Sequence, residues 1–201
     1  MSDERHDAMQ HGESWNEAKA LPVLINTAHP DILKVQPFQL KYNIDGKARR
    51  YTPDVLLVWS DDMWVVEIKE DERAELSVEK ARFAEIERAL ASHRMNFLVW
   101  KKSVICAEPR LHNAFRIMRY QRCPVPAFDR ERLRLQFEER PQIALGSLSD
   151  DDIRYVLYLV IDGTLHLDWW SRLSPGSIIS TTPIGRQEWP NSRSQSNRFS
   201  A

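Results

Sequence analysis

Three side chains in the first half of the chain could together bind a divalent cation: Asp54, Glu67 and Lys69. Mg²⁺ and Mn²⁺ accept oxygen ligands, which the two carboxylates supply. Two carboxylates close together in an apolar environment repel each other, and one shifts towards protonation unless positive charge compensates. The ammonium group supplies part of that charge, and a metal ion could supply the rest. A phosphodiester is the substrate class that fits such a site, while a surface salt bridge at a sheet edge is the alternative interpretation.

The residues around this set predict the β-hairpin that would bring it together. Residues 55–59 and 64–66 are apolar runs rich in β-branched and aromatic side chains, and residues 60–63 are typical of a turn. A hairpin closed by a loop of these four residues sets Asp54 opposite Lys69. The second acid lies two positions before the lysine and therefore projects from the same face of the sheet. The even number of loop residues keeps all three groups on that face.

The composition indicates a soluble protein that is not a polycation. The chain has 201 residues, which suits one compact domain with an appendage or two small domains. It carries 28 Lys+Arg against 29 Asp+Glu, so any contact with nucleic acid must be local. Cys106 and Cys123 lack metal-ligand spacing and are expected to be reduced thiols. The first residues lack the apolar stretch of a signal peptide, and no apolar run reaches the roughly 20 residues that span a bilayer, so a cytoplasmic protein is expected.

Helical and extended patterns alternate along the first 122 residues. A helix is predicted from about residue 14 to residue 25, with Ser14 as N-cap and Glu17 three positions later in a capping-box pattern. Pro22 falls inside this span and should kink the helix or divide it in two. The whole order predicts an α/β fold with a mixed sheet flanked by helices. Beyond the first helix we expect a half-buried strand at 38–44, a two-residue turn at Asp45-Gly46, a helix at 75–92, a buried strand at 96–100 and a helix at 109–121.

The last third of the chain has a different organisation. Residues 123–126, Cys-Pro-Val-Pro, mark a boundary. Helices are predicted at 129–139 and 149–161, followed by a short hairpin at 163–168. Helices followed by a hairpin predict a small, mostly helical unit like a winged helix. The last twenty residues, from Thr182, lack apolar periodicity and are expected to be disordered.

Four short segments follow one another along the chain: Glu17 on a helix, Gln36-Pro37, Thr52-Pro53-Asp54 and Glu67-Ile68-Lys69. Their order resembles the PD-(D/E)-x-K nuclease superfamily and, within it, the TnsA-type endonuclease subunit of heteromeric transposases. Further similarity to that family lies at 13–17, 109–114 and 120–122, and a less specific similarity at 156–168.

This resemblance implies a restriction-endonuclease-like fold and metal-dependent cleavage of double-stranded DNA at a transposon end, in the bacterial cytosol. The implied metal ligands are Asp54 and Glu67, joined by the Ile68 carbonyl, with Mg²⁺ or Mn²⁺ as the ion. Lys69 would orient the attacking water, and Glu17 would help to hold a second metal or a water. Gln36 would support the site. The implied partners are a DDE transposase subunit, which cuts the other strand, and an AAA+ ATPase regulator.

On this basis we predict a disordered tail at 1–12, a nuclease domain at 13–123, a winged-helix-like partner-binding domain at 124–181 and a second disordered tail at 182–201. Three alternatives stay open: a defence or repair nuclease of the same fold, a catalytically silent DNA-binding or scaffold subunit, and an adaptor whose main function lies in 124–181. The basic residues expected to contact DNA phosphates are Lys41, Lys47, Arg49, Arg50, Lys101, Lys102, Arg110, Arg116, Arg119 and Arg122.

Overall fold

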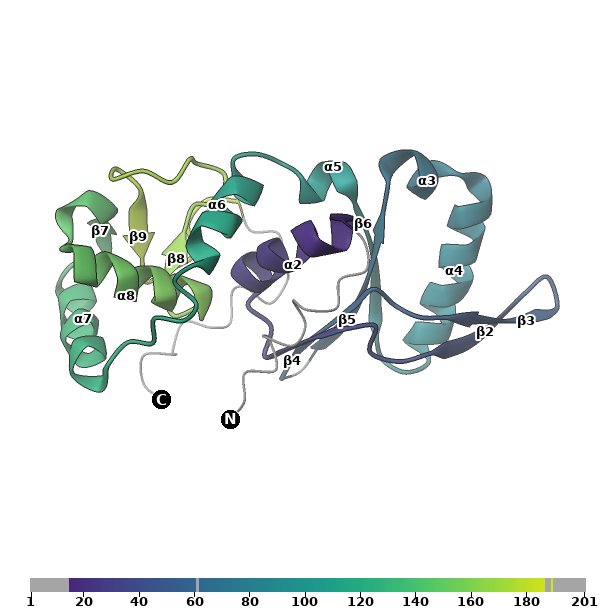
Figure 1. The fold of residues 1–201 in the computed structure, drawn as a ribbon. Helices are drawn as coiled ribbons and strands as arrows, with labels where there is room; N and C mark the ends of the chain where they lie inside the picture. Colours follow the sequence, from purple (N-terminus) through teal and green to yellow (C-terminus); the bar gives the residue numbers. More distant parts are fainter. Residues whose placement is uncertain (1–14, 61, 187–188, 190–201) are drawn as a thin grey trace. The chain divides into compact units, whose positions relative to one another are not determined.

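A computed structural model describes residues 15–60, 62–186 and 189 of the chain (Figure 1). The described residues divide into two compact units. The first unit comprises 15–21 and 30–106, and the second comprises 22–29 and the residues from 107 onwards. The division after Cys106 differs from the boundary predicted after residue 123, because the helix that follows Pro109 packs with the second unit.

A four-stranded sheet forms the centre of the first unit, and it is mixed, as the sequence predicted. Its strands are β1 (Ile32–Val35), β4 (Val55–Trp59), β5 (Asp62–Lys69) and β6 (Asn96–Lys101), in the order β1-β4-β5-β6. Strand β4 is antiparallel to both β1 and β5, whereas β6 runs parallel to β5. Strand β1 was not predicted, because its four residues lie in a short segment between two prolines and give too little pattern to detect.

A two-stranded hairpin precedes the central strands. It consists of β2 (Leu40–Ile44) and β3 (Lys47–Tyr51), joined by the predicted two-residue turn. Asp45 and Gly46 have φ values of 50° and 71°, which are the positive values that a type I′ turn requires. Buried and exposed residues alternate along β2, as expected for a strand with one face against the core.

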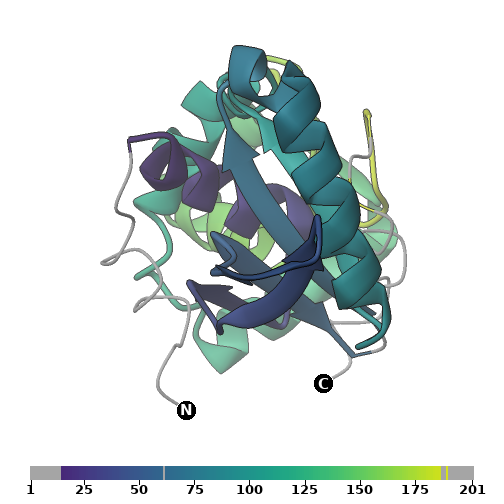
Figure 2. The same cartoon turned by 90° about the vertical axis from the view of Figure 1, so that its right-hand side faces the viewer.

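Two helices connect β5 to β6: α3 (Asp71–Glu75) and α4 (Ser77–Ala91). The sequence predicted a single helix over 75–92, whose spacing gives an apolar face of Val78, Ala81, Phe83, Ile86 and Leu90. The last three are buried, as predicted. The prediction was wrong for Val78, which is 68% exposed, and for Ala81, which is also exposed. Helix α4 lies against the sheet and the β2–β3 hairpin (Figure 2). The shared core contains Leu40, Tyr42, Tyr51, Leu56, Val65, Phe83, Ile86 and Leu90.

Helix α2 (Trp15–Ala28) is divided between the two units at Pro22. The predicted N-cap, Ser14, lies outside the described residues, and the helix extends three residues beyond its predicted end at Ile25. Pro22 cannot donate a backbone hydrogen bond to the preceding turn. The side-chain amide of Asn26 donates a hydrogen bond to the Pro22 carbonyl at 2.7 Å, which stabilises the turn that follows the proline.

The second unit combines helices with a small sheet. Helices α6 (Arg110–Met118), α7 (Ala127–Glu139) and α8 (Asp150–Ile161) agree with the predicted helical stretches. Ser149 caps α8 by accepting a hydrogen bond from the Asp152 amide. The expected hairpin at 163–168 is wrong in its extent, because these residues hold only the first strand, which pairs antiparallel with the next strand of the chain at 178–180. The strand order of the small sheet is β7 (Gln142–Ala144), β9 (Ile178–Ser180), β8 (His166–Leu167). Two short helical elements complete the described fold: α5 (Lys102–Ile105) in the first unit and η1 (Leu145–Ser147) in the second.

Across the part of the chain that the structure describes, every helix is too short or too polar to cross a membrane.

Candidate active site

The register of the β4–β5 hairpin decides which charged side chains face each other. Val55 pairs with Val66, so the preceding residue, Asp54, lies across from Glu67. The predicted partner, Lys69, is two residues further along β5. The error arose because β5 begins at Asp62, which leaves a two-residue loop where the sequence suggested four. Both loop lengths are even, so the predicted sharing of one face by the three charged groups holds.

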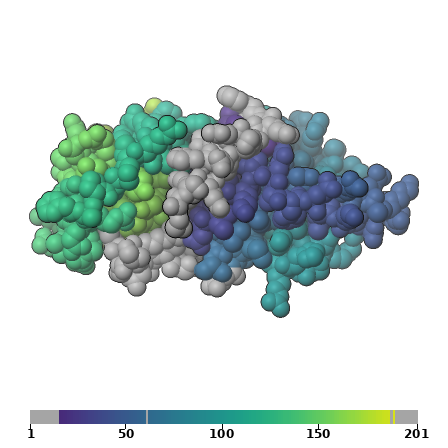
Figure 3. All heavy atoms as spheres, turned by 60° about the horizontal axis from the view of Figure 1, so that its bottom comes forward, coloured from purple at the N-terminus to yellow at the C-terminus, as the bar shows by residue number. Residues whose placement is uncertain are grey.

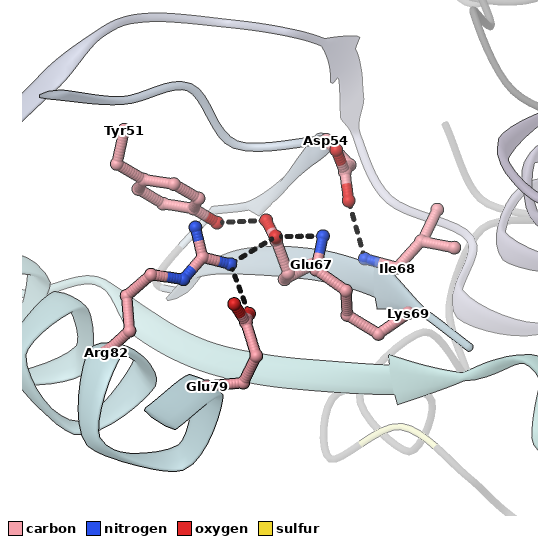
Figure 4. A network of polar contacts seen from close by, with 7 residues as sticks. All are labelled: Tyr51, Asp54, Glu67, Ile68, Lys69, Glu79 and Arg82. Atoms are coloured by element: carbon pink, nitrogen blue, oxygen red, sulfur yellow. Dashed lines mark hydrogen bonds and ion pairs between the residues drawn. The ribbon is translucent and has the colours of Figure 1, made fainter. Parts of the chain in front are cut away.

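Glu67 is the most enclosed charged group of this face, with a side chain only 4% exposed. Three donors reach its carboxylate (Figure 4). Lys69 Nζ lies 2.6 Å from Oε1, the Tyr51 hydroxyl donates to Oε2 at 2.7 Å, and Arg82 Nη2 lies 3.4 Å from Oε1. These donors come from β5, β3 and α4, so three elements converge on one carboxylate. An ionised carboxylate at this depth requires such compensation, since burial without it is costly.

Asp54 lies beside this group at the start of β4 and is fixed through the backbone. Its Oδ2 accepts a hydrogen bond from the Ile68 amide at 2.6 Å, and its carbonyl accepts one from the Gln36 amide at 3.0 Å. Burial and the nearby charge of Glu67 raise the pKa of the Asp54 carboxyl to about 6, and the charge of Glu17 adds to the rise. The Ile68 amide and Lys69 oppose this shift and only partly offset it. The ionised form of Asp54 is therefore short of positive charge.

The remaining predicted site residues occupy less direct positions. Glu17 lies in the first turn of α2, close enough for its charge to affect the pKa of Asp54. Gln36 has a positive φ of 46° and an exposed side chain, so its observed contact with Asp54 is made by its backbone amide. The structure thus brings Asp54, Glu67 and Lys69 together, as predicted, with Glu17 within electrostatic range.

The chemistry of the donors can be compared with what a divalent cation requires. Among residues 15–60, 62–186 and 189, no group of three or more His, Cys, Asp or Glu side chains is gathered closely enough to form a ready metal site. Two adjacent carboxylates are present, and the raised pKa of Asp54 indicates that its own charge is only partly compensated. Oxygen donors without sulfur or imidazole suit Mg²⁺ or Mn²⁺. The site therefore fits a cation that completes its coordination with water and substrate oxygens.

The basic residues predicted to contact DNA fall into different settings. Lys41, Lys47, Arg49 and Arg50 are exposed on the β2–β3 hairpin, which reaches the surface at the blue end of Figure 3. None of these four forms an ion pair within the described part of the chain. The basic residues that engage acidic partners are Lys101, with Glu75, and Lys102, whose Nζ lies 3.1 Å from a Glu70 carboxylate oxygen.

The basic residues predicted to contact DNA in the second unit range from buried to exposed. Arg110 is fully buried, so its prediction as a DNA contact was wrong. Arg119 stacks 4.8 Å above the Tyr120 ring and donates to its hydroxyl. Arg116 and Arg119 line a cavity of about 500 Å³ within this unit, and Arg122 is exposed.

Sequence reasoning missed two members of the site, Tyr51 and Arg82. Tyr51 stands three residues before Asp54 in the Arg-Tyr-Thr-Pro-Asp segment, and its position ending a polar strand was an available signal. Arg82 is one of several charged residues on the helix of 75–92, and nothing in the sequence separates it from the others.

A mixed sheet flanked by helices, with two acids and a lysine on one face, is compatible with a nuclease fold. Residues 30–101 match the family model described as TnsA-like endonuclease N terminal, so this segment is similar to the N-terminal domain of TnsA-like endonucleases. The match confirms the resemblance seen in the sequence and supports a transposition-associated nuclease in general, a family that implies DNA and a transposase as partners. It includes Asp54, Glu67 and Lys69, while Glu17 and the second unit lie outside it. No curated protein matches this chain.

Proposed function

We propose that this protein is a metal-dependent endonuclease subunit that hydrolyses a DNA phosphodiester at a transposon end, together with a DDE transposase. The observation that carries the proposal is the adjacent pair Asp54 and Glu67, with Lys69 Nζ 2.6 Å from the second carboxylate. The TnsA-like match over the same residues gives the reaction class. Phosphodiester hydrolysis requires negative groups that hold a metal ion and a positive group that stabilises the phosphate. The two carboxylates supply the first, and the lysine supplies the second.

In this proposal Asp54 and Glu67 hold Mg²⁺ or Mn²⁺, and the Ile68 carbonyl is a third candidate ligand. The bound ion would lower the pKa of a coordinated water and neutralise charge on the phosphate. Lys69 orients the attacking water and offsets the negative charge that develops on the phosphorus oxygens. The Ile68 amide holds Asp54 in place through its 2.6 Å hydrogen bond. Glu17 contributes a further negative charge, in keeping with its predicted role near a second metal or a water.

The main alternative is a catalytically silent subunit that binds DNA or acts as a scaffold. The electrostatics of Asp54 favour the enzyme. A structural carboxylate is normally stabilised in its ionised form by its partners, whereas burial and Glu67 make the ionised form of Asp54 unfavourable. Groups held in unfavourable protonation equilibria cluster at functional sites, which supports a catalytic role here.

DNA binding in this proposal involves the exposed basic residues of the β2–β3 hairpin. Lys41, Lys47, Arg49 and Arg50 would contact phosphates, which positions a duplex without reading its sequence. Target choice would then come from partners, namely the DDE transposase and an AAA+ ATPase regulator. The second unit, with its arginine-lined cavity, is the proposed partner-binding region.

The test measures nicking of plasmid DNA by the wild-type protein and by Asp54→Ala, Glu67→Ala and Lys69→Ala, each with Mg²⁺, Mn²⁺ or EDTA. Each variant should lose about 10²–10⁴-fold in rate while remaining folded by circular dichroism. Lys80→Ala is a matched control, because this lysine is exposed and pairs with Glu75, not with either proposed metal ligand. Wild-type activity in Lys69→Ala would refute the role of the lysine. Absence of cleavage and of Mn²⁺ binding in the wild-type protein, with or without the transposase, would favour the silent scaffold.

A further inference from the structure

The Tyr51 hydroxyl contacts Glu67, a proposed metal ligand, and the proposed function gives this hydroxyl no role. Tyr51 is the last residue of β3 and is 5% exposed. Its hydroxyl donates a hydrogen bond to Glu67 Oε2 at 2.7 Å. Its ring packs edge-on against Phe97, with 6.4 Å between centroids, so the donor is held in place.

Arg82 reaches the same carboxylate from α4. Its Nη2 lies 3.4 Å from Glu67 Oε1 and 2.8 Å from Glu79 Oε2, and its guanidinium lies 5.0 Å from the centre of the Phe83 ring. Glu79 and Phe83 belong to the same helix and hold the guanidinium in position. The longer contact to Glu67 is thus the one that the helix presents to the site, as Figure 4 shows.

The three donors around Glu67 limit how its carboxylate can turn. An ionised carboxylate has about four lone-pair positions. Tyr51 takes one on Oε2, while Lys69 and Arg82 both approach Oε1. Because Tyr51 and Arg82 come from two different elements, rotation of the carboxylate would break at least one contact. The direction of the lone pairs that remain free on the Glu67 carboxylate is therefore set by these neighbours.

We propose that Tyr51 and Arg82 are positioning residues that fix the Glu67 carboxylate for metal binding. This inference rests on the proposed function. It also gives the β2–β3 hairpin a second role. Strand β3 carries the exposed basic residues Lys47, Arg49 and Arg50, and it ends at Tyr51, whose hydroxyl contacts Glu67. Contact of DNA with the hairpin would therefore act on the same strand that orients Glu67.

The test compares Mn²⁺ affinity, measured by titration calorimetry, with nicking rates across a range of Mn²⁺ concentrations. Tyr51→Phe keeps the ring and removes the donor, and we expect a loss of about 10–100-fold in metal affinity, typical for partners that orient a ligand. Arg82→Gln should lose a similar amount, and Arg82→Lys should recover part of it. Tyr42→Phe is the matched control, since Tyr42 lies in the same buried core and should keep wild-type affinity.

The outcomes separate this inference from the proposed function. If the wild-type protein binds Mn²⁺ and cuts DNA, and Tyr51→Phe does both equally well, the positioning role is wrong and the nuclease stands. If Tyr51→Phe and Arg82→Gln only lower the melting temperature while the folded protein binds Mn²⁺ as tightly as before, the two residues are structural and the inference also fails. If the wild-type protein neither binds Mn²⁺ nor cuts, the proposed function itself fails.

Discussion

The two units bury charges of opposite sign, and they treat them differently. In the first unit, Glu67 is 3% exposed and lies beside Asp54, whose pKa is raised to about 6 by burial and by that neighbour. In the second unit, Arg110 is 0% exposed, and its guanidinium lies 5.0 Å from the centre of the Trp170 ring. The first unit concentrates like charges, whereas the second places a cation over an aromatic face, where it is favoured.

The carboxylate pair of the first unit is suited to binding a cation, whereas the buried arginine of the second unit stabilises the fold. Asp54, whose ionised form is disfavoured by burial and by the charge of Glu67, gains from a ligand that brings positive charge. A guanidinium stacked on tryptophan gains from the protein itself, and the exposed fraction of zero leaves it no role at the DNA surface. Replacements should therefore have opposite effects on stability in the two units.

The largest effect is expected for Arg110→Ala. Loss of a fully buried side chain and its stacking on Trp170 should destabilise the second unit by about 3 kcal/mol. Hydrogen-exchange mass spectrometry, which resolves the two units, would show faster exchange in 107–186. Arg122→Ala, at an exposed position, is the control and should change little. Equal exchange in both variants would break the comparison.

The opposite sign is expected for Asp54→Asn. The carboxyl has a folded-state pKa of about 6 against an ordinary value of 3.8, so the folded state binds more protons between these pH values. The stability of the wild-type protein then falls as pH rises from about 4 to about 6, and the full cost remains at higher pH. The asparagine should stabilise the first unit by roughly 2 kcal/mol at pH 8 and by almost nothing at pH 4, while abolishing cleavage. Urea denaturation at both pH values measures this, and a loss of stability at pH 8 would contradict it.

A smaller effect of reversed pH dependence is expected in the second unit. Burial lowers the pKa of His166 to about 4 from its ordinary 6.5. The unfolded chain binds more protons between these values, so stability is present above pH 6.5 and is lost as pH falls towards 4. We expect a loss of about 1–2 kcal/mol over this range, allowing for partial exposure of the ring. His166→Gln should remove this loss, and His112→Gln, at an exposed position, should not.

The smallest effect on stability, within about 0.5 kcal/mol, is expected for Arg49→Ala with Arg50→Ala, since both residues are exposed. Their effect should appear in DNA binding instead. Each lost phosphate contact lowers the slope of log affinity against log salt by about 1. Fluorescence anisotropy at several salt concentrations measures the slope. An unchanged slope would remove the hairpin from the proposed DNA surface.

Local pattern was enough to predict most elements and the grouping of the site. Alternation in 38–44 and the Asp45-Gly46 turn predicted the first hairpin, because backbone chemistry at a two-residue turn is local. The shared face of Asp54 and Glu67 followed from an even loop length alone. The register did not, because the residues at 60–63 allow loops of two or four residues, and the observed pairing of Trp59 with Asp62 corresponds to the shorter loop.

Contacts between distant segments could not be predicted. The Tyr51 and Arg82 contacts with Glu67 depend on how β3 and α4 pack, which no local pattern encodes. Arg110 looked like a surface cation because its charge suggested exposure, whereas stacking on Trp170, sixty residues later, buries it.

The division of helix α2 at Pro22 affects how this protein could be taken apart. Residues 22–29 belong to the second unit: the Trp189 indole donates to the Thr27 hydroxyl at 3.1 Å, and the His29 ring lies 3.2 Å from the Ile161 carbonyl. Severing the chain after Cys106 would leave these residues on the N-terminal fragment, separated from the unit that they complete. The two halves should accordingly work best by fragment complementation, with neither reaching full solubility when expressed by itself.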